Sequence, residues 1–103
     1  MAKRIIYNVT VNVDDDIHEE WLQWMRQVHI PDVMATGCFI EWRICRLLME
    51  EEKGVTYAIQ YTASSMADFE KYQRLFAPEL QRQHSEKFKD KFVAFRTLLE
   101  QLE

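Results

Sequence analysis

In residues 4–13 every second side chain from Ile5 onward is apolar, and this pattern constrains the fold more than any other stretch. The apolar positions are Ile5, Tyr7, Val9, Val11 and Val13. A period of two in residues that favour strands predicts a β-strand with one buried face and one polar face. The intervening Asn8, Thr10 and Asn12 are neutral and short, which is unusual for a fully solvated surface. We therefore expect another structure to cover that face.

The composition is that of an ordinary folded protein. Of the 103 residues, 48% are hydrophobic and 29% are charged, and the low counts of glycine and proline leave most of the chain for regular elements. A chain of this length predicts one domain over residues 1–103. The net charge of -4 argues against a nucleic-acid partner, because phosphate-binding surfaces are usually basic.

Three features predict a cytoplasmic protein. No apolar run approaches the ~20 residues of a membrane span, so no membrane partner is expected. The N-terminus enters the first strand at once and lacks the shape of a signal peptide. Cys38 and Cys45 are separated by strand residues and too distant to bridge, which favours free thiols.

Helical spacing of apolar residues follows the first strand. Asp16 and Glu19 have the spacing of a capping box, and a helix is predicted over about residues 16–29. Its apolar stripe consists of Ile17, Trp21, Trp24, Met25 and Val28. Pro31 is suited to open a further helical turn over residues 31–36.

Two strands and a polar turn come next. Alternating residues predict strands over 38–48 and 55–63, and the acidic segment 50–54 between them predicts a solvated hairpin turn. Along the first of these strands, Trp42 is expected to point towards the core.

A second helical region and a last strand complete the chain. Ser65 is a predicted N-cap, and Pro78 is expected to kink or restart the helix. The apolar stripe of this region contains Phe69, Tyr72, Phe76, Leu80 and His84. Residues 91–99 favour a strand, although a helix over 90–102 is the alternative.

The predicted element order is βαββαβ, which is the ferredoxin-like α+β arrangement. Right-handed crossovers place both helices on one face of a four-stranded antiparallel sheet. The other face, called here the open face, is predicted to carry polar groups and some apolar ones. Its expected polar residues are Asn8, Thr10, Asn12, Glu41, Arg43, Cys45, Thr56, Gln60, Thr62 and, depending on the register of the last strand, Arg96.

Such a mixed face is either solvated or paired with a second copy. We favour a homodimer because Ile6, Phe39 and apolar residues of the last strand would otherwise form an exposed patch. A second copy would close a barrel from two sheets.

Four segments of the chain resemble a domain-of-unknown-function family of about this length. They are residues 5–13, 21–39, 56–61 and 91–97. The helix, the His-x-Pro motif and the Gly-x-Phe motif before a strand are also similar to the dimeric α/β-barrel superfamily, which includes cofactor-free monooxygenases and isomerases. The resemblance implies the fold and dimerisation, and it assigns no activity.

His29 is the candidate catalytic residue. The superfamily resemblance implies that a histidine at this position faces a ligand cavity, where an imidazole can transfer a proton near neutral pH. The alternative is a histidine that interacts with the carbonyl groups at a helix C-terminus. His18 lies roughly 16 Å along the same helix, too distant to share a metal ion, and no metal site or cofactor is predicted.

The open face supplies the candidate ligand-binding residues. Arg43 and Arg96 are suited to an anionic group, and the alternative is that Glu41 and the arginines form salt bridges. The full candidate set is Asn8, Asn12, Glu41, Arg43, Gln60 and Arg96.

Two functions follow from these features. The first is a homodimer that binds a small molecule or has a structural role. The second is a cofactor-free enzyme that uses His29 as acid and base in a cavity with Asn8, Asn12 and Arg96.

Overall fold

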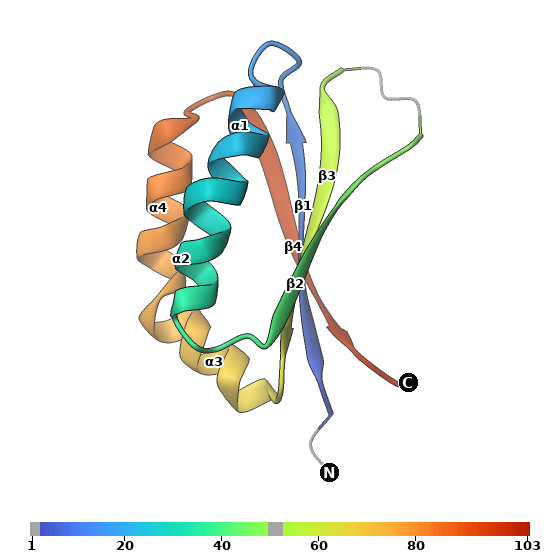
Figure 1. The fold of residues 1–103 in the computed structure, drawn as a ribbon, viewed down its shortest axis with the longest axis vertical. Coiled ribbons are helices and arrows are strands. Elements are labelled where there is room, and N and C mark those ends of the chain that lie inside the picture. Colours follow the sequence, from blue (N-terminus) through green and yellow to red (C-terminus); the bar gives the residue numbers. More distant parts are fainter. Residues whose placement is uncertain (1–2, 50–52) are drawn as a thin grey trace.

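The computed structural model describes residues 3–49 and 53–103, in which one antiparallel sheet carries helical segments on one face (Figure 1). The strand order is β2-β3-β1-β4. The strands are β1 (Ile5–Val13), β2 (Glu41–Arg46), β3 (Val55–Ala63) and β4 (Phe92–Glu100). The helical segments are α1 (His18–Trp24), η1 (Met25–His29), α2 (Ile30–Ala35), α3 (Met66–Leu75) and α4 (Ala77–Lys87). This is the predicted ferredoxin-like α+β fold.

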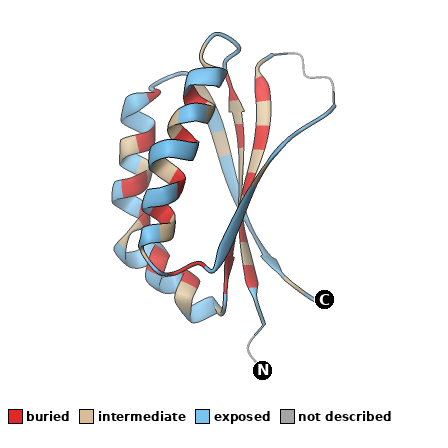
Figure 2. Cartoon of the chain, in the orientation of Figure 1, coloured by how far each residue is buried: buried red, intermediate tan, exposed pale blue. Residues whose placement is uncertain are grey.

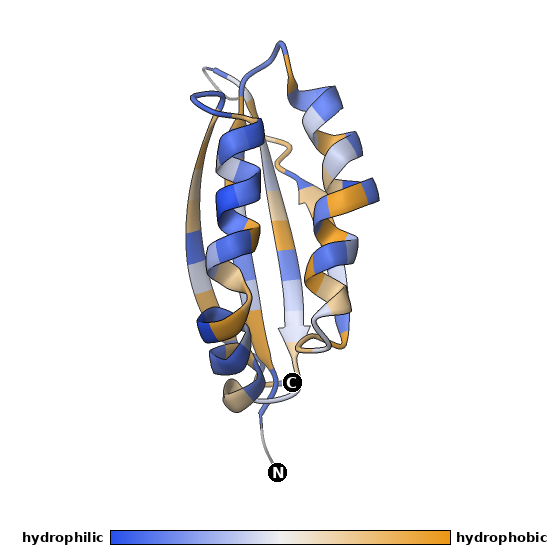
Figure 3. Cartoon of the chain, turned by 90° about the vertical axis from the view of Figure 1, so that its left-hand side faces the viewer, coloured by the Kyte–Doolittle hydropathy of each residue, from blue (hydrophilic) through white to orange (hydrophobic). Residues whose placement is uncertain are grey.

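β1 lies between β3 and β4 and organises both sides of the sheet. Its odd-numbered residues face the helices, and Val11 and Val13 have almost no exposed surface. β3 has the predicted bounds and the same alternation, with Asn8 opposite Gln60 in the ladder. Buried residues therefore gather between the sheet and the helices (Figure 2), and from the helical side hydrophobic and hydrophilic bands alternate along the strands (Figure 3).

The first helical arm is continuous from α1 through η1 to α2. The predicted cap is wrong, because the N-cap is Ile17 without a side-chain hydrogen bond, and Asp16 instead pairs with Lys91. The predicted helical turn that Pro31 opens is confirmed, because α2 begins at Ile30 with Pro31 in its first turn. The π-helical turn η1 precedes Pro31, and this wider turn accommodates a ring that lacks an N–H donor.

β2 is shorter than predicted. The sequence also predicted the wrong environment for two aromatic residues, one just before β2 and one within it. Phe39 lies before the strand and is buried, with its ring 4.8 Å from Tyr72 and 6.2 Å from Tyr7. It therefore belongs to the core and not to the open face. Trp42, expected in the core, is 43% exposed. The predicted hairpin turn at 50–54 lies largely outside the described residues.

The second helical arm follows the prediction. The hydroxyl of Ser65 accepts a hydrogen bond from the backbone N–H of Asp68 at the start of α3. The helix is interrupted at Phe76, and α4 restarts with Pro78 in its first turn. No helix in the described part of the chain is long and apolar enough to cross a membrane.

β4 confirms the predicted last strand and excludes the alternative helix. Its register places Arg96 opposite Val9, on the face that the helices cover. The prediction that Arg96 joins the open face is therefore wrong. Val93, Phe95 and Thr97 take the open-face positions instead.

Candidate functional site

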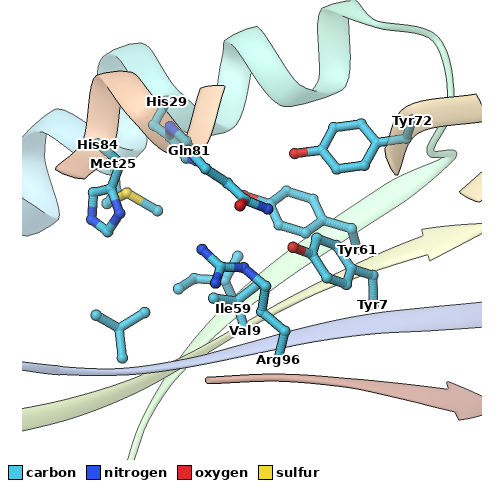
Figure 4. Close-up of a pocket in the computed structure, with 11 residues that line it drawn as sticks. Tyr7, Val9, Met25, His29, Ile59, Tyr61, Tyr72, Gln81, His84 and Arg96 are labelled. Carbon is cyan, nitrogen blue, oxygen red and sulfur yellow. The ribbon is translucent and has the colours of Figure 1, made fainter. Parts of the chain in front are cut away.

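A cavity between the helical layer and the sheet collects the titratable side chains of the core (Figure 4). Its lining residues are Tyr7, Val9, Val11, Met25, His29, Ile59, Tyr61, Tyr72, Gln81, His84 and Arg96. The cavity opens towards solvent, and its volume of ≈ 20 Å³ is enough for about one water molecule. The inner part is therefore narrow.

His29 reaches this cavity from the π-helical turn η1. Trp24 stacks on it at 5.3 Å between ring centroids, and the ring of His84 lies 5.5 Å away. Its Nδ1 is buried and has no hydrogen-bond partner among the residues of 3–49 and 53–103. A wider helical turn at this point redirects the side chains that follow it, and such turns frequently occur at functional sites.

Both cavity histidines are neutral at pH 7. Burial lowers the pKa of His29 to about 4; the nearby Asp32 charge opposes this effect and the Arg96 charge adds to it. Burial also lowers the pKa of His84 to about 3, with His29 and Arg96 contributing in the same direction. Each ring thus offers one donor and one acceptor.

Three tyrosines point their hydroxyl groups into the same space. Burial raises the pKa of Tyr7, Tyr61 and Tyr72, so all three are neutral phenols. Tyr61 is 2% exposed, and its hydroxyl has no hydrogen-bond partner in the described part of the chain. A buried hydroxyl without a partner is costly, and a ligand group at this position would relieve that cost.

Arg96 extends from β4 towards the cavity, and Gln81 extends from α4 (Figure 4). The positive charge of Arg96 favours the ionised form of Tyr7 and Tyr72 and disfavours the charged form of both histidines. None of the ion pairs among the described residues includes Arg96. The cavity therefore has a cation at its mouth that no carboxylate of the described part of the chain neutralises.

The candidate residues of the open face form a separate arrangement. Arg43 Nε donates to Gln60 Oε1 at 2.7 Å, and Gln60 Nε2 donates to Asn8 Oδ1 at 3.2 Å. Asn8 Nδ2 donates in turn to the hydroxyl groups of Thr97, at 3.2 Å, and Thr10, at 3.0 Å. A row of hydrogen bonds thus crosses all four strands, and we call Arg43, Gln60, Asn8 and Thr97 the polar row.

The remaining candidates also lie on the open face. Asn12 Nδ2 donates to Thr56 Oγ1 at 2.9 Å and to the carbonyl of Lys53 at 3.1 Å. Glu41 lies in the ladder opposite Thr62 and lines an open groove with Arg43 and Gln60. The structure brings Arg96 together with His29, but it places Asn8 and Asn12 on the opposite side of the sheet from them.

Sequence reasoning missed the other half of the cavity. His84 and the hydroxyls of Tyr61 and Tyr72 were read only as parts of apolar stripes. The available signal was a histidine on the buried stripe of the second helix. Within 3–49 and 53–103, no group of three or more His, Cys, Asp or Glu residues is placed to hold a metal ion.

The sheet, its one-sided helical layer and the enclosed polar cavity define a ferredoxin-like α+β protein. A dimeric ferredoxin-like protein from an uncultured marine organism has this fold, with a TM-score of 0.74 and 14% identity over 97% of this chain and 95% of that chain. The cofactor-independent oxygenase SnoaB from Streptomyces nogalater is also similar, with a TM-score of 0.67 and 14% identity over 99% and 96% of the two chains. A conserved protein of unknown function from Bacteroides thetaiotaomicron is described as a possible oxidoreductase. Its TM-score is 0.71, with 11% identity over 98% of this chain and 100% of that chain.

At such identities these neighbours establish a shared fold alone. The chain belongs to the DUF4286 family, a domain of unknown function, whose match covers residues 4–102. No curated protein matches the chain.

Proposed function

We propose that this DUF4286 chain is a single-domain homodimer that binds a small molecule in the cavity between its helices and its sheet. The observation that carries the proposal is that two buried polar atoms, His29 Nδ1 and the Tyr61 hydroxyl, belong to the lining of one cavity and have no hydrogen-bond partner within residues 3–49 and 53–103. Ligand pockets typically combine apolar walls with a few polar groups and perturbed pKa values, as this cavity does.

The open face is proposed as the dimer seam. Its polar row is satisfied by hydrogen bonds within one chain, so it has less need of a ligand than the cavity has. Val93 and Phe95 beside the row are 71% and 61% exposed. A second copy would cover these side chains, and neighbours of the same fold are described as dimeric. The free thiols of Cys38 and Cys45 support a cytoplasmic location.

A blocked cavity mouth tests the ligand site. Gln81 is partly exposed beside Arg96, so a Gln81→Trp side chain is expected to fill the mouth without disturbing the core. Fragments that bind the wild-type protein in ligand-observed NMR should lose their signals with this variant.

The matched control is Gln83→Trp on the same helix, because Gln83 hydrogen-bonds Glu79 and does not line the cavity. Fragments that bind all three proteins equally would place the site elsewhere. The absence of any fragment bound to the wild type would remove the binding function.

A cofactor-free enzyme is the second candidate function. The specific observation in its favour is that His29 is a neutral imidazole with a buried Nδ1, which is the form a general base requires. The small volume of the cavity means that lining side chains must rearrange before a substrate reaches this atom. The similarity to a cofactor-independent oxygenase supports a search for this chemistry.

The enzyme proposal is tested by oxygen uptake and product mass with phenolic and enolisable probes in the absence of cofactors. A His29→Gln variant should lose any turnover. A His18→Gln variant should keep it, because His18 Nδ1 lies 3.0 Å from the Tyr57 hydroxyl and does not line the cavity. Equal turnover by both variants would exclude His29 as the base.

A further inference from the structure

The charge of the cavity lining is set by one residue. The described lining contains no Asp or Glu side chain, its three tyrosines are protonated phenols, and its two histidines are neutral at pH 7. Arg96 is the remaining ionisable group, and an arginine is protonated at every physiological pH. The lining as described thus carries a net positive charge within a partly enclosed, mostly neutral environment.

No carboxylate among the residues that the structure describes compensates this charge. Ion pairs of the described residues involve Lys3, Arg82 and Lys91 with acidic partners, and Arg96 is in none of them. Arg96 hydrogen-bonds the hydroxyl of Tyr7, which is a neutral partner. Since no acidic partner among the described residues neutralises it, its positive charge is available to pair with an anion that enters from solution.

Neutral donors surround the position that such a group would occupy. The hydroxyl of Tyr7 and the side-chain amide of Gln81 lie beside Arg96, and the hydroxyls of Tyr61 and Tyr72 point to the same space (Figure 4). O–H and N–H groups directed at one point stabilise an anionic oxygen, and the planar guanidinium adds paired N–H donors. A cationic ligand would meet the Arg96 charge directly.

The walls around this polar centre are apolar. Val9, Val11, Met25 and Ile59 line the sheet and helix sides of the cavity. A ligand that matches both parts has an apolar body and one oxyanion. The inner space is only large enough for a water-sized group, so the oxyanion would enter it and the apolar body would stay at the mouth.

We propose that the cavity binds a small organic monoanion whose oxyanion pairs with Arg96 and the adjacent tyrosine hydroxyls. This inference rests on the proposed function, since it names the ligand class of the same cavity. Carboxylates and phenolates share the required chemistry, and the two are separated by the choice of probes.

The probes are benzoate, 4-nitrophenol above and below its own pKa, benzamide and benzylammonium, titrated by NMR at constant ionic strength. Benzoate or 4-nitrophenolate should bind at least tenfold more tightly than benzamide, and benzylammonium should not bind. Binding of benzoate alone identifies a carboxylate site. A preference for ionised over neutral 4-nitrophenol identifies a phenolate site.

Variants at Arg96 test whether the preference for anionic probes depends on the positive charge of this side chain. Arg96 is exposed on β4, so Arg96→Gln and Arg96→Lys are expected to fold, which circular dichroism verifies. Arg96→Gln should weaken anion binding at least tenfold and leave benzamide unchanged, while Arg96→Lys should retain part of the affinity. Arg74→Gln, which removes an exposed arginine of α3 outside the cavity lining, should leave all affinities unchanged.

The anion inference would be overturned if benzamide bound as tightly as benzoate and Arg96→Gln changed neither affinity. The proposal that the cavity binds a ligand would still stand. Failure of both anions to bind at millimolar concentration would also overturn the anion inference. The proposed function is judged separately by the Gln81→Trp experiment, which uses uncharged fragments as well.

Discussion

The indole N–H of Trp21 donates a 2.8 Å hydrogen bond to Nε2 of His84, joining α1 to α4 inside the core. A neutral imidazole that accepts at Nε2 carries its proton on Nδ1. The low pKa of His84, about 3, keeps the ring neutral at pH 7. This one contact therefore determines which nitrogen of His84 acts as a donor in the cavity wall.

Replacement of Trp21 by phenylalanine should remove the preference of His84 for the tautomer with its proton on Nδ1. Without the indole donor, Nε2 of His84 is a buried acceptor without its partner, which costs about 1–3 kcal/mol in the free energy of unfolding. Long-range ¹H–¹⁵N NMR should show a mixture of both tautomers. Trp24→Phe is the control, because Trp24 stacks on His84 at 5.8 Å and its loss should leave the tautomer unchanged. An unchanged tautomer in Trp21→Phe would contradict the assignment.

Acid should destabilise the fold through the two cavity histidines. Their folded pKa values, about 4 for His29 and about 3 for His84, lie below the ordinary value of 6.5, so the unfolded chain binds protons more readily. Their stabilising contribution is present above pH 6.5 and is lost as the pH falls towards the folded values. At pH 5 the loss should be up to about 2 kcal/mol for each histidine, measured by urea unfolding.

A His29→Gln variant separates this effect from the titration of carboxylates. The variant should lose only about half as much stability between pH 7 and pH 5 as the wild type. His18→Gln is the matched control and should retain the wild-type pH dependence, because His18 lies outside the cavity. Equal losses in all three proteins would assign the acid sensitivity to other groups.

Several parts of the fold could be predicted because a single face of each element is apolar. In β1 and β3 the odd-numbered residues are buried, or partly buried in the case of Val9, so a slip by one residue would expose the whole core face. β4 differs, since Phe92 and Ala94 face the helices while Val93 and Phe95 face outward. Alternation was therefore no guide to its register, and only the pairing with β1 places Arg96 in the cavity.

The site could be predicted only in part, for a related reason. His29 was found because its local motif resembles a known superfamily. His84 packs against it from another helix, and no local pattern reveals a contact between segments distant in the chain. The π-helical turn η1 is likewise a product of packing around Pro31, and helical periodicity alone does not distinguish it from an α-helix.

Loss of the hydroxyl group should stabilise the protein at Tyr61 and destabilise it at Tyr57. The Tyr61 hydroxyl is buried without a partner among the described residues, so Tyr61→Phe should raise the free energy of unfolding by about 1 kcal/mol. The Tyr57 hydroxyl lies 3.0 Å from His18 Nδ1, and Tyr57→Phe should lower the free energy of unfolding by about 0.5–1 kcal/mol. Thermal and urea unfolding of both variants measure the difference, and a destabilised Tyr61→Phe would show that its hydroxyl is already satisfied.

Phe95 tests the open face as the dimer seam. It lies opposite Thr10 on that face and is 61% exposed in the single chain, so a second copy would bury it beside the polar row. Phe95→Glu would bury two carboxylates in the seam, one from each copy, which is costly because each charge loses its hydration. The variant should be a monomer at micromolar concentration in light scattering coupled to size exclusion, where the wild type should be a dimer. Leu75→Glu removes another large apolar residue, 55% exposed on α3, and should leave the dimer intact. Dissociation by Leu75→Glu and not by Phe95→Glu would assign the seam to the helical side.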